Sequence, residues 1–174
     1  RPVGALELKG LDQPVPASRV AWVTASDQVI PLPAALRVGS GLPFVGRIEQ
    51  RRQLDERLKE ALAGRGGIVL VAGEPGIGKS RLVTELAASA HAEGVTVSYG
   101  RCDQDALFPY QPFAEALRHL HSNGVVPASR GIELLLPDIG DAPTMDPDRA
   151  RSLVLDATRS ALRDAAADRP LVLV

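Results

Sequence analysis

The sequence is poor in cysteine and aromatic residues, and neither sign of charge is in clear excess. Its 174 residues include one cysteine, one tryptophan, two tyrosines and three phenylalanines, and the formal net charge is −1. A single cysteine, Cys102, excludes an internal disulfide and therefore a disulfide-stabilised scaffold. A balanced charge leaves no electrostatic footprint for nucleic acid, so we predict no nucleic-acid partner for this chain.

Long apolar runs are also missing. No stretch approaches the roughly 18 residues of a membrane-spanning helix, and none has the pattern of a secretory signal peptide. We therefore predict no membrane partner and expect the protein in the cytoplasm. The chain starts at Arg1 without a methionine, and it stops in the apolar stretch 171–174 with no turn after it. We accordingly expect a fragment of a longer protein.

Residues 73–80 carry the clearest chemical signal, because they match the P-loop pattern G-x-x-x-x-G-K-[ST] in full. The apolar, β-branched run 68–72 before them predicts a buried parallel strand, and residues 82–90 after them have a helical pattern. Strand, glycine loop and helix thus follow in the order that phosphate binding requires. The predicted fold class is α/β: a P-loop NTPase with a parallel sheet and flanking helices, incomplete in this chain.

Each residue type in this loop has a chemical reason. Glycines let backbone N–H groups point inward around a triphosphate at the positive end of a helix. Lys79 is expected to reach the β- and γ-phosphates, and Ser80 to place its hydroxyl on a Mg²⁺ ion that bridges them. Ser80 is therefore the predicted metal ligand. The predicted nucleotide-binding residues of the loop are Gly73, Glu74, Pro75, Gly76, Ile77, Gly78, Lys79, Ser80 and Arg81.

Local patterns divide the rest of the chain into elements. Short strands are predicted at 5–8 and 17–23, joined as a β-hairpin, and the prolines, glycines and serines of residues 24–41 indicate a linker. The remaining predicted elements are helices at 48–63, 114–121 and 148–167, strands at 95–99 and 171–174, and a loop-like region at 123–147.

Several single residues outside the loop have candidate roles. Arg101 and Asp103 follow the strand at 95–99, at the edge where open α/β sheets bind ligands, although a surface ion pair is the commoner explanation. Cys102 is predicted to be a small buried residue. His119 and His121 are two apart on a helix and are expected on different faces, which argues against a shared metal, and His91 is expected to be solvated.

The predicted hairpin has a family resemblance. Residues 6–16, Leu-Glu-Leu-Lys-Gly-Leu-Asp-Gln-Pro-Val-Pro, resemble the closing hairpin of bacterial class III adenylate/guanylate cyclase domains. The resemblance implies that Lys9 contacts nucleotide phosphates in a complete cyclase; the alternative is a solvated charge at a turn. The metal-binding aspartates of such a domain would precede Arg1, so this chain alone is not expected to cyclise a nucleotide.

A second resemblance covers the remainder. Phe44-Val45-Gly46-Arg47, the helix after it and the P-loop are arranged as in the AAA-type and STAND ATPases found beside cyclase domains and in large LuxR-type regulators, and residues 100–103 and 109–113 extend the likeness. In those families the hydrophobic-Gly-Arg segment lies over adenine. The resemblance therefore implies ATP and Mg²⁺ as cofactors, with Phe44 and Val45 contacting the base as part of the segment that ends at Arg47. The alternative for these two residues is core packing. Ile48 stands where family members often carry an acidic residue.

The two resemblances together imply a domain organisation: a cyclase-like hairpin at 1–23, a linker at 24–41, and the N-terminal part of an AAA/STAND P-loop ATPase domain at 42–174. The implied function is binding and hydrolysis of ATP by a regulatory module of a multidomain bacterial signalling protein. Its implied partners are nucleotide, covalently linked cyclase and effector domains, and further copies in a nucleotide-dependent oligomer.

The alternative function is a scaffold or latch that is gated by nucleotide and does not hydrolyse it. The acidic residues that would separate the two are expected after Val174, so no catalytic residue is assigned.

Overall fold

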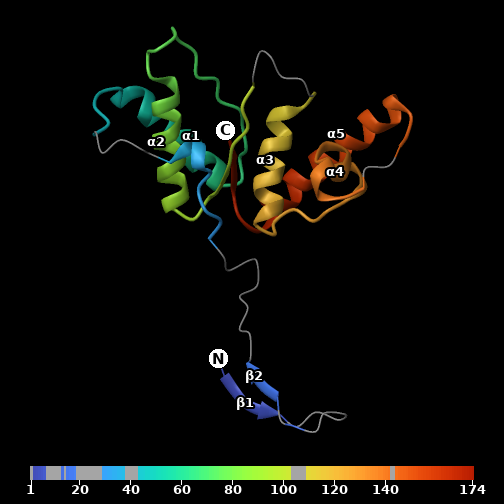
Figure 1. The fold of residues 1–174 in the computed structure, drawn as a ribbon. Helices are drawn as coiled ribbons and strands as arrows, with labels where there is room; N and C mark the ends of the chain where they lie inside the picture. Colours follow the sequence, from blue (N-terminus) through green and yellow to red (C-terminus); the bar gives the residue numbers. More distant parts are fainter. Residues whose placement is uncertain are drawn as a thin grey trace.

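The computed structural model describes residues 2–6, 13, 15–18, 29–37, 43–102, 109–141 and 144–174. Figure 1 shows how its elements are arranged. The helices are α1 (Ile48–Leu62), α2 (Lys79–Ala92), α3 (Gln111–Ser122), α4 (Arg130–Leu135) and α5 (Pro147–Asp168), with 3-10 turns η2 (Ala34–Leu36) and η3 (Pro137–Ile139). The strands are β1 (Pro2–Leu6), β2 (Val15–Ser18), β3 (Thr96–Ser98) and β4 (Leu171–Leu173). Within these ranges, no helix has both the length and the apolar character needed to cross a membrane.

The first two strands form an antiparallel pair, in which Leu6 lies opposite Val15 and Ala5 opposite Pro16. The predicted pairing is therefore present, but the second strand starts at Val15, inside the stretch that we had predicted as a turn. Proline is tolerated there because a two-stranded ribbon leaves the outer edge of each strand without a hydrogen-bonding partner. Lys9 lies outside the described residues, and the likeness to cyclases stays a prediction.

The second sheet is parallel and lies between two groups of helices. Thr96 pairs with Leu171, and Ser98 pairs with Leu173. A parallel pair requires a crossover, which α3, α4 and α5 supply. Successive residues of a strand point to opposite faces. Val172 accordingly packs with the cluster formed by α1, α2 and β3, whereas Leu171 packs with the cluster formed by α3, α4 and α5.

The stretch 68–72 is not the buried parallel strand that its sequence predicts. It runs as coil into the P-loop (Figure 1). Ile68 and Leu70 are 92% and 89% exposed. Apolar, β-branched composition favours an extended backbone. An extended segment becomes part of a sheet only when a neighbouring strand donates and accepts the backbone hydrogen bonds. No described strand pairs with this stretch, so the prediction was wrong about both its pairing and its burial.

The region 123–147, predicted as loop-like, contains α4 and η3. Ile132 and Leu136 are buried against α5, in the same cluster as Leu117 and Leu120 of α3. Gly131 allows this close approach of α4 to α5, because a Cβ atom there would lie 2.4 Å from the Cβ atom of Ala157. A helix of six residues has too few turns to show a clear period, which is why the sequence pattern did not reveal it.

Residues 29–37, which we call the strap, lie within the stretch predicted as a linker. Its 3-10 turn, η2, contacts α2, and Leu36 is buried among residues of α1, α2 and β3. The strap is thus packed against the core. The predicted domain boundaries themselves stay a prediction.

Candidate functional site

The loop at residues 73–78 has a backbone that only glycine adopts easily. Gly78 is the N-cap of α2 at φ 90°, in the left-handed region. Gly73 has φ 159°, and a Cβ atom on it would lie 3.1 Å from Cγ2 of Ile77. Side chains at these two positions would strain the turn or fill its interior. The sequence pattern and the observed backbone therefore agree on a cradle lined by main chain.

The start of α2 offers unpaired N–H groups to this cradle. Its N-cap makes no side-chain hydrogen bond, and the first turn contains no acidic residue. The first N–H groups of a helix have no partner within the helix, and the helix dipole makes this end positive. An anion such as phosphate accepts hydrogen bonds from these N–H groups and is attracted by the positive end of the helix.

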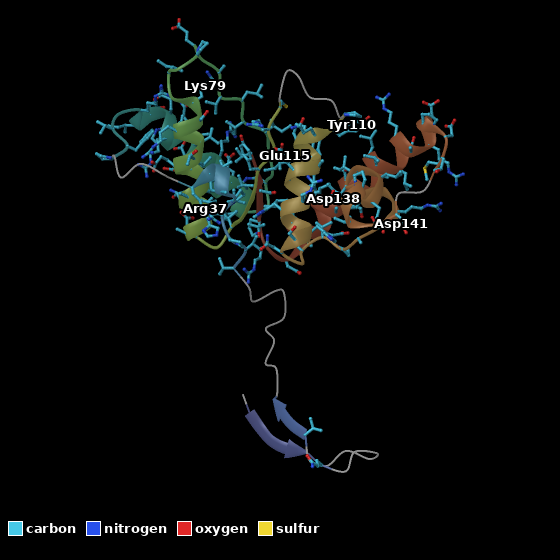
Figure 2. The ribbon with its side chains drawn as sticks, in the orientation of Figure 1. Arg37, Lys79, Tyr110, Glu115, Asp138 and Asp141 are labelled. Carbon is cyan, nitrogen blue, oxygen red and sulfur yellow. The ribbon has the colours of Figure 1, made fainter. Side chains whose placement is uncertain are left out.

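Lys79 places its charge over the same loop (Figure 2). Its Nζ donates to the carbonyl oxygens of Gly73, at 3.0 Å, and Glu74, at 2.9 Å. Ammonium donors exchange easily between carbonyl and phosphate oxygens, because both are hydrogen-bond acceptors and the phosphate adds opposite charge. Lys79 thus places its ammonium group at the loop, and its contact with phosphate stays a prediction.

The two residues after Lys79 have different surroundings. Ser80 is exposed and lies in the first turn of α2, where its carbonyl accepts a hydrogen bond from Oγ1 of Thr84 at 2.8 Å. Arg81 forms an ion pair with Glu85 at 2.8 Å along the same helix. The side chain of Arg81 is thus engaged along α2 with a residue one turn farther down the helix.

Arg47 joins the site from another element. It is the N-cap of α1 and has φ 52°, an uncommon backbone conformation for a residue with a side chain. A Cβ atom on Gly78 would lie only 3.7 Å from Nη2 of Arg47, so the guanidinium adjoins the P-loop. Strained backbone of this kind costs about 1–3 kcal/mol and clusters at functional sites. The sequence had singled out the segment, but not that its arginine would reach the phosphate loop.

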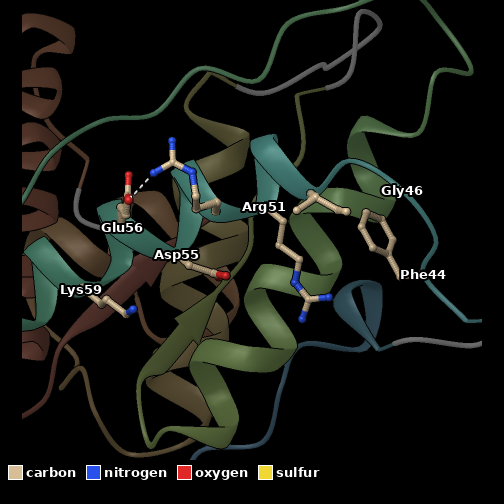
Figure 3. Close-up of a pocket in the computed structure, with 8 residues that line it drawn as sticks. Phe44, Gly46, Arg51, Asp55, Glu56 and Lys59 are labelled. Atoms are coloured by element: carbon tan, nitrogen blue, oxygen red, sulfur yellow. Dashed lines mark hydrogen bonds and ion pairs between the residues drawn. The ribbon is translucent and has the colours of Figure 1, made fainter.

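Phe44 and Val45 lie apart from the P-loop residues. Phe44 lines a surface groove of about 440 Å³ along α1 (Figure 3). Val45 is 82% exposed. The residues that line this groove are Phe44, Gly46, Ile48, Arg51, Arg52, Asp55, Glu56 and Lys59. None of them belongs to residues 73–80.

The end of β3 is fixed by a close contact with α3. A Cβ atom on Gly100 would lie 1.9 Å from the carbonyl oxygen of Pro112, so only glycine permits this approach. Glu115 accepts hydrogen bonds from the N–H of Arg101, at 2.9 Å, and from Nε2 of Gln111, at 3.1 Å. The first of these bonds is the main cause that lowers the pKa of Glu115 below its ordinary value. Sequence reasoning missed Glu115, although its spacing of four residues from Gln111 was visible.

The other single residues have mixed outcomes. Cys102 is exposed, so its predicted burial was wrong, and Asp103 lies outside the described residues. His91 was predicted to be solvated, but its Nε2 lies 2.8 Å from the carbonyl oxygen of Ile30. His121 bonds to Val126, whereas His119 faces the strap, which confirms that the two histidines point apart. In the ranges that the structure describes, no cluster of three or more His, Cys, Asp or Glu side chains could hold a metal.

Loop, lysine, serine and helix terminus together fit a nucleoside triphosphate with Mg²⁺. When bound, the metal would neutralise charge on the phosphates, and Ser80 is the residue that would hold it. The described residues thus supply main-chain donors, a hydroxyl and the cations of Lys79 and Arg47.

A family model described as AAA ATPase domain matches residues 43–174. Comparison with curated proteins found no match, and comparison with solved structures found none either. The matched range contains the P-loop, Arg47, the sheet of β3 and β4, and helices α1 to α5.

Proposed function

Because the chain belongs to the AAA ATPase domain family, we propose that it binds ATP with Mg²⁺ through residues 73–80 and hydrolyses the bound ATP. The observation that carries this proposal is the position of Lys79, whose ammonium group lies over the carbonyl oxygens of Gly73 and Glu74 at the uncapped start of α2. Backbone donors, a mobile cation and a hydroxyl then converge on one anionic ligand.

Each residue has a separate role in this proposal. The N–H groups of the loop and of the first turn of α2 bind phosphate oxygens, and Lys79 moves from its carbonyl partners to the β- and γ-phosphates. Ser80 holds the metal, and Arg47 adds positive charge beside Gly78. Phe44 and Val45 are proposed base contacts, which requires the base to extend from the loop past Arg47 toward the groove on α1.

Binding and hydrolysis are separable by experiment. ATP binding is measured by titration calorimetry, and inorganic phosphate release is followed under the same conditions, with Mg²⁺ or with EDTA. We expect ATP to bind more tightly with Mg²⁺ than with EDTA, and phosphate to be released only when Mg²⁺ is present. Ser80→Ala should abolish the gain from Mg²⁺ while ATP still binds in EDTA. Ser122→Ala, at the end of α3, is the matched control and should behave as the wild type does.

The alternative is a nucleotide-gated latch that binds ATP without hydrolysing it. Saturable Mg-ATP binding without phosphate release would support the latch and refute the ATPase. Absence of ATP binding would refute both.

We further propose that this module works in the cytoplasm as a regulatory part of a multidomain signalling protein linked to a class III cyclase or to LuxR-type effector domains, and that it forms oligomers in response to nucleotide. The likeness of residues 6–16 to a cyclase hairpin supports the first linkage. The test is cyclase activity of the full-length protein: Lys79→Ala should alter it if the P-loop regulates the cyclase. Unchanged activity despite lost ATP binding would reject the coupling.

A further inference from the structure

The strap, residues 29–37, is seated on the side of the domain opposite to the P-loop. Leu36 is 3% exposed and packs with Leu58 of α1 and Ala87 of α2, and Ile30 is buried too. Figure 2 shows Arg37, the last residue of the strap, toward the end of α2 that lies away from Lys79. Apolar burial of this kind attaches the strap to the folded domain, although it makes no ladder with any described strand.

Two histidines from different helices hold consecutive carbonyl groups of the strap. Nε2 of His91, on α2, lies 2.8 Å from the carbonyl oxygen of Ile30. His119, on α3, interacts with the next carbonyl group, that of Pro31. The strap therefore has a histidine of α2 and a histidine of α3 beside two of its consecutive carbonyl groups.

The environment of His119 does not suit a charged imidazole. Its Nε2 is buried and has no hydrogen-bond partner among the described residues. Burial is the main cause that lowers the pKa of His119; the Pro31 carbonyl opposes this shift, and the positive charge of Arg37 adds to it.

Three other charged or titratable groups on α2 and α3 have partners of their own. On α3, Arg118 pairs with Asp138. His121 bonds to the Val126 carbonyl. On α2, His91 bonds to Ile30, and a protonated His91 could still donate that bond. His119 is therefore the group at this seam whose protonation opposes docking.

We propose that the strap is a proton-sensitive latch, which docks against neutral His119 and is released when His119 takes up a proton. A protonated ring carries a second N–H donor, and in the docked state that donor at Nε2 would be buried without an acceptor. It would also place a positive charge beside Arg37. In the released state, water solvates both groups.

The sign of the pH dependence follows from linkage. The docked state lowers the pKa of His119 below its ordinary value of 6.5, so docking is strongest above pH 6.5 and weakens as the pH falls through that value. One titrating group changes the docking equilibrium by at most about tenfold per pH unit.

Hydrogen exchange on the full 174-residue chain tests the latch. Exchange of the strap amides is measured between pH 5.5 and 8 and corrected for the intrinsic pH dependence of exchange, which gives the opening equilibrium. We expect strap opening to increase by up to about tenfold per unit as the pH falls below 6.5, while amides of the core around Leu117 and Leu120 stay protected. His119→Gln, which keeps a side-chain donor for Pro31 but does not titrate, should make strap opening independent of pH.

His121→Gln is the matched control, because it changes a histidine of the same helix that bonds away from the strap. Its strap opening should keep the dependence of the wild type. A second measurement applies if His119→Gln opens the strap at every pH: the NMR titration of the His119 ring in the wild type should give a pKa below 6.5. Strap opening that is independent of pH in the wild type, or a ring pKa at or above 6.5, would overturn the proposal.

Discussion

Replacing Lys79 with alanine removes the ammonium group that lies over the P-loop. In the structure this group donates two hydrogen bonds, to Gly73 and Glu74. Nucleotide binding exchanges them for bonds to phosphate oxygens. Hydrogen bonds to charged groups contribute about 1.5–3 kcal/mol each, and giving up the carbonyl bonds offsets roughly half of that gain. The net loss is about 1.5–3 kcal/mol, which corresponds to a rise in the ATP dissociation constant of about 10- to 150-fold.

The assay is titration calorimetry with Mg-ATP on the wild type, Lys79→Ala and Arg163→Ala. Arg163 is an exposed cation of α5, outside both the loop and the groove on α1, so the control makes the same change in net charge. Thermal unfolding should be nearly the same for all three proteins, because the two lost carbonyl bonds of Lys79 are exposed and alanine is favourable in a helix. Equal ATP affinity for the wild type and Lys79→Ala, with both folded, would refute the assignment of the phosphate site.

Three further predictions concern the loop, the end of β3 and the coil before the loop. Gly78→Ala should weaken ATP binding, since its φ of 90° costs an alanine about 1–2 kcal/mol, whereas Gly64→Ala, at φ 81° after α1, should lower stability by a similar amount and leave ATP affinity unchanged. Glu115→Gln should lower the free energy of unfolding near pH 7. Because the folded state lowers the pKa of Glu115, the difference in this free energy between the wild type and the variant should vanish as the pH falls below 4.5. A difference that stays constant down to pH 3 would contradict the role of the Glu115 charge. Leu70→Lys should reduce aggregation, measured by light scattering, without lowering the melting temperature. Leu54→Lys, at a position only 6% exposed, should lower the melting temperature. If the melting temperatures of the two variants fell by similar amounts, Leu70 would be shown to be packed.

Local patterns were sufficient for the elements whose signal lies within a few residues. The glycines, lysine and serine of residues 73–80 define the P-loop because each residue type has a backbone or chemical requirement there, and α2 begins at Lys79 as that motif demands. The strand at 95–99 and the helix at 148–167 were recognisable by their periods of 2 and 3.6, and the structure has β3 and α5 at those places. A periodic pattern of apolar residues can be read directly from the sequence, without the structure.

Contacts between distant residues were decided only by the tertiary structure. Composition indicated a strand at 68–72, yet pairing depends on a neighbouring strand, and none of the described strands lies in hydrogen-bonding register with it. Likewise, the strap has the composition of a linker, but Leu36 reaches a pocket built from α1, α2 and β3. Arg47 meets Gly78 across 31 positions of sequence, and no periodic pattern encodes such a contact. The sequence by itself determined the phosphate loop, because its requirements are local; packing in three dimensions determined which arginine joins it and which histidines hold the strap.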